Sequence, residues 1–206
     1  CWAFPAVTVG LLWAPSLRGS RIWLVACWPV SAAEPTHLRI EPMAAPVHLT
    51  FFGGLGEIGR NCAALETQGR IVLLDCGQLF PDDMPGVDAV LPDFGWLLER
   101  ADHLEACIVT HAHEDHIGGL PYLLRSLAKR GATLPIYGAP FTLGMVRGKL
   151  KAAGVSVPDL IPLDDHARLP IGPFDCEFLP VTHSTPSGLM TVFDTPQGRI
   201  LHSSDF

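Results

Sequence analysis

The most constraining feature of the sequence is a cluster of metal-binding residue types at residues 111–116. Three histidines, one glutamate and one aspartate fall within these six residues, directly after a short apolar run. Side chains two positions apart on an extended chain point the same way, so His111 and His113 can meet one ion. Asp115 and His116 come one short turn later and can face a second ion; imidazole and carboxylate groups suit zinc or manganese. A polar loop with solvated histidines is the alternative, but so many ligands behind a buried-strand pattern favour a metal site.

The composition is that of a folded protein with one core. At 206 residues, with 48% hydrophobic and 17% charged residues, the chain is expected to be globular. With a formal charge of −7, the chain as a whole lacks the excess of basic residues that is typical of nucleic-acid-binding proteins. This argues only weakly against a phosphate-bearing substrate, because two bound cations would supply local positive charge. The six cysteines include no C-x-x-C pair and are interpreted as buried apolar residues in a reducing compartment.

Residues 1–46 differ from the rest and are interpreted as a non-domain extension of low order. Four of the five tryptophans lie here among scattered prolines, with no regular helical or strand period. Two arginines and the apolar residues 22–28 imitate a signal peptide, but Pro29 interrupts the apolar stretch, and no run reaches the roughly 20 residues of a membrane span. Met43 offers a translation start, so residues 1–42 are interpreted as upstream or non-native sequence, with an export signal as the alternative.

Residues 47–52 are expected to form a strand that runs into the glycine-rich loop 53–61. Three glycines in this loop have the spacing G-x-G-x-x-G of a dinucleotide-binding fingerprint, which requires a helix at the last glycine. The following residues 61–75 instead predict a β-hairpin. We therefore predict no nucleotide cofactor, and expect the glycines to allow turns with positive φ and a close approach of the backbone to a neighbouring site.

The remaining sequence alternates between strand and helix patterns and predicts an α/β fold. Helices are expected at residues 94–100, 119–129 and 140–153, and strands at 106–110, 134–138, 174–182, 189–194 and 199–203. Asp75 closes the first hairpin, where a carboxylate can hold a metal-binding histidine in its orientation. It can equally be a turn aspartate that bonds its own backbone, and both interpretations stay open.

Three strand ends are expected to bring the candidate ligands together, because the carboxyl ends of strands in a layered α/β protein converge on one edge. His183 follows one late strand and Asp205 follows the final hairpin. The expected ligands are, for one ion, His111, His113 and His183, and, for the other, Asp115 and His116, with Asp205 bridging both.

These motifs together resemble the metallo-β-lactamase fold and, more closely, the ribonuclease J family. The resemblance rests on the metal-binding cluster with its later histidine and aspartate, and on the loop 53–61. It includes the segments 86–88, 91–94, 113–122, 135–138 and 204–206. It extends over residues 47–206 and does not reach the first 46.

The resemblance implies a four-layer αβ/βα sandwich carrying a two-metal, zinc-dependent hydrolase, with Mn²⁺ or Mg²⁺ as alternative ions. The implied substrate is RNA, cleaved by 5′→3′ exonuclease and endonuclease activity in RNA processing and decay. A cytoplasmic homo-oligomer without membrane association is expected. Asp115 and His116 are the implied catalytic residues, and Asp115 would orient or deprotonate the attacking water as well as bind metal.

Two departures from the family pattern matter. The family usually has Ile-Pro-Asp after the late histidine, whereas this chain has Thr185-Pro186-Ser187 and lacks that carboxylate. Family members also continue past the Asp-Phe motif into a β-CASP domain and then supply a further histidine to the second metal. We therefore expect residues 47–206 to be the N-terminal part of the domain. The alternatives are a hydrolase of small thioesters or lactams, which the glycine loop disfavours, and a catalytically silent fragment.

Overall fold

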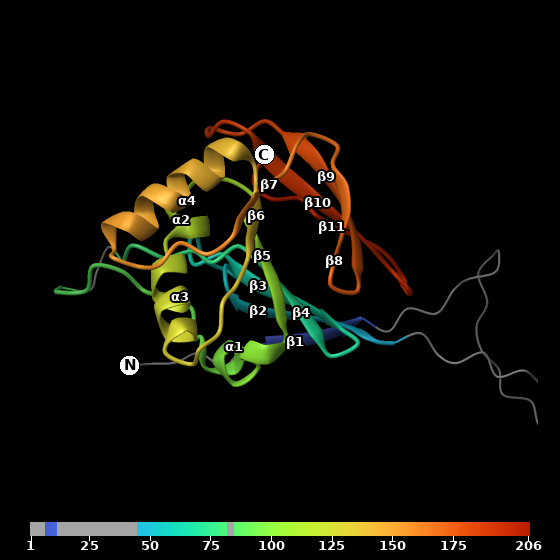
Figure 1. Ribbon diagram of the computed structural model, residues 1–206, viewed down its shortest axis with the longest axis horizontal. Helices are drawn as coiled ribbons and strands as arrows, with labels where there is room; N and C mark the ends of the chain where they lie inside the picture. Colours follow the sequence, from blue (N-terminus) through green and yellow to red (C-terminus); the bar gives the residue numbers. More distant parts are fainter. Residues whose placement is uncertain (1–6, 12–44, 82–84) are drawn as a thin grey trace, which may run out of the picture.

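The computed structural model describes residues 7–11, 45–81 and 85–206, which form two stacked sheets and a layer of helices (Figure 1). Most of the extension expected at residues 1–46 lies outside the described residues. Its described part includes a strand that the sequence did not predict, β1 (Val7–Leu11), which pairs antiparallel with β2 (Val47–Gly53) at the edge of the larger sheet. The division into an extension and a domain stays a prediction.

The larger sheet has seven strands arranged in sequence order. Strands β1 to β4 are antiparallel, and β4 to β7 run parallel. After β1 and β2 come β3 (Cys62–Thr67), β4 (Arg70–Leu74), β5 (Leu104–Ile108), β6 (Ile136–Gly138) and β7 (Leu160–Pro162). The antiparallel pair β3 and β4 confirms the hairpin predicted after the glycine loop, so a strand follows the last glycine where a dinucleotide fingerprint requires a helix.

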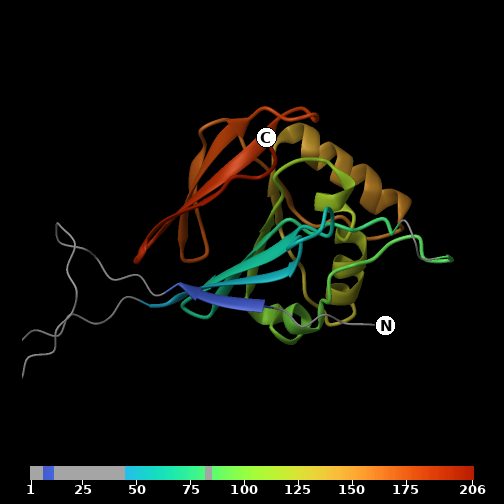
Figure 2. The ribbon, with the colours of Figure 1, turned by 180° about the vertical axis from the view of Figure 1, so that it is seen from behind.

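Helices cover one face of this sheet (Figure 1), and the view from behind in Figure 2 shows the same layering. The helical elements are α1 (Gly95–Glu99), a 3-10 turn (Ala101–His103), α2 (Glu114–Ile117), α3 (Leu120–Ala128) and α4 (Pro140–Ala152). The three predicted helices are confirmed to within one residue at each end. The sequence did not predict α2 as a separate helix, and it begins directly after His113. No described helix is both long and apolar enough to cross a bilayer.

A four-stranded antiparallel sheet packs on the other face of the larger sheet (Figure 1). Its strands, in the spatial order β11-β10-β9-β8, are β8 (Arg168–Ile171), β9 (Phe174–Val181), β10 (Gly188–Thr195) and β11 (Gly198–His202). The predicted strand at residues 174–182 and the predicted final hairpin are confirmed. The short strands β7 and β8 were not predicted.

Alternating apolar residues along β4 supply both hydrophobic cores. Ile71 and Leu73 pack in the core beneath the helices, which includes the leucines of α3. Val72 and Leu74 point the other way and pack with the phenylalanines of the small sheet. Period-two alternation places neighbouring side chains on opposite faces, so one apolar strand serves both layers. The described residues thus form a helix–sheet–sheet stack, in which the helices lie on one outer face, as expected for this part of an αβ/βα sandwich.

Candidate metal centre

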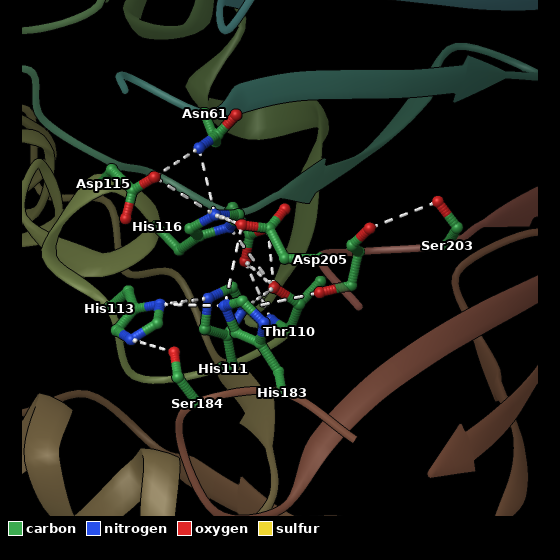
Figure 3. Close-up of polar contacts among 12 residues, drawn as sticks. Asn61, Thr110, His111, His113, Asp115, His116, His183, Ser184, Ser203 and Asp205 are labelled. Carbon is green, nitrogen blue, oxygen red and sulfur yellow. Dashed lines mark hydrogen bonds and ion pairs between the residues drawn. The ribbon is translucent and has the colours of Figure 1, made fainter. Parts of the chain in front are cut away.

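The predicted ligands come together where the two sheets meet (Figure 3). The segment with His111 and His113 follows β5 of the larger sheet, whereas His183 follows β9 and Asp205 follows β11 of the smaller sheet. Convergence along one sheet edge, expected from the sequence, was wrong in detail. Strand ends of two different sheets form the site, because the turn of α2 and the ends of the small sheet face each other.

The first group consists of three imidazoles. Nδ1 of His113 lies 2.9 Å from Nε2 of His111 and 3.2 Å from Nε2 of His183. In a tetrahedral zinc site with Zn–N bonds of about 2.0–2.1 Å, the ligand atoms are about 3.3 Å apart. Two of the three separations are therefore close to that of ligands around one ion, and all three ligand nitrogens lie within 4.8 Å of one another. The group could hold one divalent cation.

The second group surrounds Nε2 of His116. Oδ2 of Asp115 lies 3.5 Å from this nitrogen, and Oδ2 of Asp205 lies 3.4 Å from it. The same oxygen of Asp205 is 3.9 Å from Nε2 of His183, so Asp205 lies between the two groups. His111, His116 and Asp205 also have ligand atoms within 4.8 Å of one another. All six predicted ligands thus lie in the cluster, and Asp205 lies between its two groups.

Buried hydrogen bonds set the tautomers of two of these histidines. Oδ2 of Asp75 lies 2.8 Å from Nδ1 of His116, so this nitrogen carries the hydrogen and leaves Nε2 free to bind an ion. The hydroxyl of Thr110 donates to Asp75, at 2.9 Å from Oδ2, and accepts from Nδ1 of His111 at 3.0 Å. Nε2 of His111 is therefore also free. Asp75 orients His116 directly and His111 through Thr110, a geometry common among metal-bound histidines.

Burial and neighbouring charges shift the pKa values in the ion-free site. Burial and the positive charge of His116 lower the pKa of His111 to about 4, so its imidazole is neutral and available. Burial opposes the charged form of His116, but the carboxylates of Asp75, Asp115 and Asp205 outweigh it and raise its pKa to about 9. Burial also opposes ionisation of Asp75, yet the contact with His116 holds its pKa below the ordinary value. A cation could replace the proton on His116.

Three polar residues of the site were not identified from the sequence. Thr110 is described above, and the hydroxyl of Ser184 lies 3.2 Å from Nε2 of His113. Asn61, at the end of the glycine loop, has its amide nitrogen 3.0 Å from both Asp115 Oδ2 and His116 Nε2. A cavity of about 140 Å³ adjoins this group, and its lining includes Asn61, Asp75, His116, His202 and Asp205. The position of Asn61 beside a predicted site-facing loop was the one signal that could have revealed it.

The fold and the set of candidate metal ligands together define the class of protein. The family described as "Beta-lactamase superfamily domain" matches residues 70–206, and the chain belongs to this family. Among solved structures, the metallo-β-lactamase fold protein YhfI from Bacillus subtilis superposes with a TM-score of 0.57 and 19% identity, covering 78% of this chain and 63% of that one. A protein of unknown function from Enterococcus faecalis has a TM-score of 0.59 at 18% identity, with 77% and 43% covered. The expected metallo-β-lactamase fold is confirmed, and this family implies bound divalent metal ions.

Within this class, the most informative similarity is to ribonuclease J. The chain is 41% identical over 171 residues to ribonuclease J of Mycolicibacterium smegmatis, covering 82% of this chain and 30% of that protein. It is 40% identical over 177 residues to ribonuclease J of Thermus thermophilus, covering 82% and 29%. The resemblance seen in the motifs is therefore confirmed. The chain spans about a third or less of the length of these curated relatives.

Proposed function

We propose that this chain carries the metal centre of a ribonuclease of the ribonuclease J type, which hydrolyses RNA phosphodiester bonds with two divalent ions, most simply zinc. The observation that carries the proposal is the cluster of four imidazoles and two carboxylates, with ligand-atom separations suited to metal ions. The similarity to ribonuclease J proteins, at 41% identity, supports RNA as the substrate class.

In this mechanism, His111, His113 and His183 would hold one ion, and Asp115 and His116 would hold the other, with Asp205 between the two groups. Two divalent ions held there would supply Lewis acidity toward a phosphodiester and would make a bound water more acidic. The Asp115 side chain is 28% exposed, against 3% for His116, so it faces the open side of the site. Asp115 would therefore orient or deprotonate the attacking water, while Asp75 and Thr110 keep the histidine rings in place.

The net charge of −7 does not exclude RNA, because the positive field at this site would come from the bound ions. The proposal includes both 5′→3′ exonuclease and endonuclease activity, a role in RNA processing and decay, a cytoplasmic location and assembly into a homo-oligomer. These follow from the ribonuclease J resemblance. Hydrolysis of a small thioester or lactam is the competing activity for the same metal centre.

The decisive experiment measures metal content and cleavage of 5′-monophosphorylated RNA by the intact protein and by His113→Ala. We expect bound divalent metal and RNA cleavage in the wild type, and loss of both in the variant, because His113 contacts both other imidazoles of its group. End-labelled RNA distinguishes release of single nucleotides from internal cuts. RNA cleavage that survives His113→Ala would disprove the mechanism, and rapid thioester or lactam hydrolysis without RNA cleavage would favour the competing activity.

A further inference from the structure

We propose that Asn61 is a positioning residue of the second ion site, and that the glycine-rich loop before it is the scaffold that holds its amide there. The inference rests on the metal centre of the proposed function and concerns a residue outside the ligand set. It gives a specific role to a loop for which the sequence predicted only turns and a close approach of the backbone to a neighbouring site.

The amide nitrogen of Asn61 contacts two side chains of the second group (Figure 3). Its nitrogen lies 3.0 Å from Oδ2 of Asp115 and 3.0 Å from Nε2 of His116. A carboxylate can only accept, so the nitrogen of the amide must face Asp115. Nδ1 of His116 donates to Asp75, so Nε2 accepts from this amide only when it carries no hydrogen of its own. In the ion-free protein His116 is protonated, and the bond that the amide donates is therefore the one to Asp115.

The contacted oxygen is the one that the second ion would use. Oδ2 of Asp115 is the atom that lies 3.5 Å from Nε2 of His116. The Asp115 side chain is partly exposed and would otherwise sample several rotamers, which an ion would have to order on binding. The bond from Asn61 selects one orientation before any ion arrives.

The backbone of Asn61 is fixed on both sides. Its N–H donates to the carbonyl of Asp115 at 2.9 Å, and its carbonyl accepts from the N–H of Gly77, also at 2.9 Å. Asn61, which directly precedes β3, is therefore anchored to α2, which carries Asp115 and His116. These hydrogen bonds use backbone atoms alone and remain when the side chain is removed. A mutation of Asn61 can therefore test the amide without disturbing the fold.

The glycine-rich loop leaves space for the Asn61 amide, and hydrogen bonds to Glu57 stabilise the conformation of the loop. Glu57 accepts from the Arg60 guanidinium at 2.9 Å through each carboxylate oxygen, and from the backbone N–H of Gly54 at 3.2 Å. Gly54 has φ +81°, and a Cβ at this position would lie 2.7 Å from Oδ1 of Asn61. Any side chain at Gly54 would therefore displace the amide of Asn61 from its present position. Gly56 has a similar φ of +72°, but a Cβ there would meet nothing within 4 Å.

This pair of glycines provides a matched test. Asn61→Ala removes the amide, and Gly54→Ala displaces it. Gly56→Ala introduces the same kind of backbone strain without touching Asn61. In the intact protein, titration of the chelator-treated form with Co²⁺ reports both the affinity and the visible spectrum of each bound ion. Thermal unfolding of the ion-free variants checks that each one is folded.

We expect Asn61→Ala and Gly54→Ala to bind the first ion normally and the second about 10- to 100-fold more weakly, with an altered spectrum of the second ion. Gly56→Ala should match the wild type in affinity and spectrum. Unchanged binding of the second ion by Asn61→Ala would overturn the inference, as would equal effects of Gly54→Ala and Gly56→Ala, or a wild type that binds only one ion. Two-ion binding without RNA cleavage would instead refute the proposed function, and the effect of Asn61 could still be read from the affinities.

Discussion

The carboxylate of Asp75 contacts the imidazole of His116, with Oδ2 2.8 Å from Nδ1, and the two side chains are only 2% and 3% exposed. The end of β4 therefore carries a buried ion pair next to the open side of the metal centre. Asp75 has a φ of +57°, a conformation that non-glycine residues adopt rarely and that aspartate tolerates better than most. The backbone at Asp75 is therefore held in an uncommon turn that directs a carboxylate at a ligand histidine.

Replacing Asp75 by asparagine should weaken both the fold and the metal centre. The new amide has only one acceptor oxygen, whereas Asp75 accepts from the Thr110 backbone, the Thr110 hydroxyl and His116. Breaking one partner of a buried pair costs about 3–5 kcal/mol, and loss of an orienting partner lowers metal affinity about 10- to 100-fold. Urea unfolding and metal titration measure the two effects. A variant with wild-type stability and affinity would show that the contact has no orienting role.

The same contact predicts a pH dependence of the ion-free protein. The pKa of His116 is raised to about 9 in the folded chain, whereas an unfolded histidine has a pKa of about 6.5. The resulting stability is fully present below about pH 6.5 and is lost as the pH rises through about 9, by a total on the order of 3 kcal/mol. Asp75 remains ionised over this pH range, because its pKa is lowered. It therefore does not contribute to the pH dependence of the unfolding free energy.

Urea unfolding of chelator-treated protein between pH 6 and 10 measures this slope. Asp75→Asn serves as the control and should show a smaller slope, because the carboxylate that contributes most to the raised pKa is gone. A free energy of unfolding that stays constant or rises between pH 6.5 and 9.5 would contradict the expected protonation of His116.

Strong local patterns made most of the fold predictable. The two apolar runs of the β3–β4 hairpin, separated by a Gln-Gly turn, and the leucine spacing of α3 are visible in the sequence and are present in the structure. The short strands β7 and β8 were missed, since each contains a proline, which argues against a strand. Both lie at the outer edge of their sheets, where proline is tolerated because one side of the backbone needs no partner. The helix α2 has only four residues, too few for a periodic pattern.

The site was predictable where its chemistry is local in sequence, as in the run from His111 to His116. Asn61 was not identified, because its contact with Asp115 spans 54 positions and depends on how the hairpin docks against α2. The role of Asp75 stayed open for the same reason. A turn aspartate and a histidine partner look alike in sequence, and only the approach of His116, 41 positions away, distinguishes them.

The buried cysteines should be chemically inert in the folded protein. Burial raises the pKa of Cys76 and of Cys107 well above the ordinary value, and raises that of Cys176 to about 12. Since the thiolate is the reactive form, iodoacetamide at pH 8 should leave these residues unmodified, and should label them after unfolding in urea. Peptide mass spectrometry assigns the label to each position. Rapid labelling of Cys76 or Cys107 in the native protein would mean that the core beneath the helices opens readily.

Substitution of His183 tests whether two sheets share one metal centre. His183 follows β9 of the small sheet, whereas His113 follows β5 of the large sheet. Nevertheless, Nε2 of His183 lies only 3.2 Å from Nδ1 of His113. His183→Ala should remove one ligand of the first ion and lower its affinity on the order of 100-fold or more, while the ion-free fold stays intact because the ring is partly exposed. The matched control is His166→Ala, since His166 is exposed and belongs to neither ligand group.

Metal analysis and circular dichroism of both variants provide the comparison. Equal metal content in the two variants would place His183 outside the centre and confine the ligands to the segment after β5.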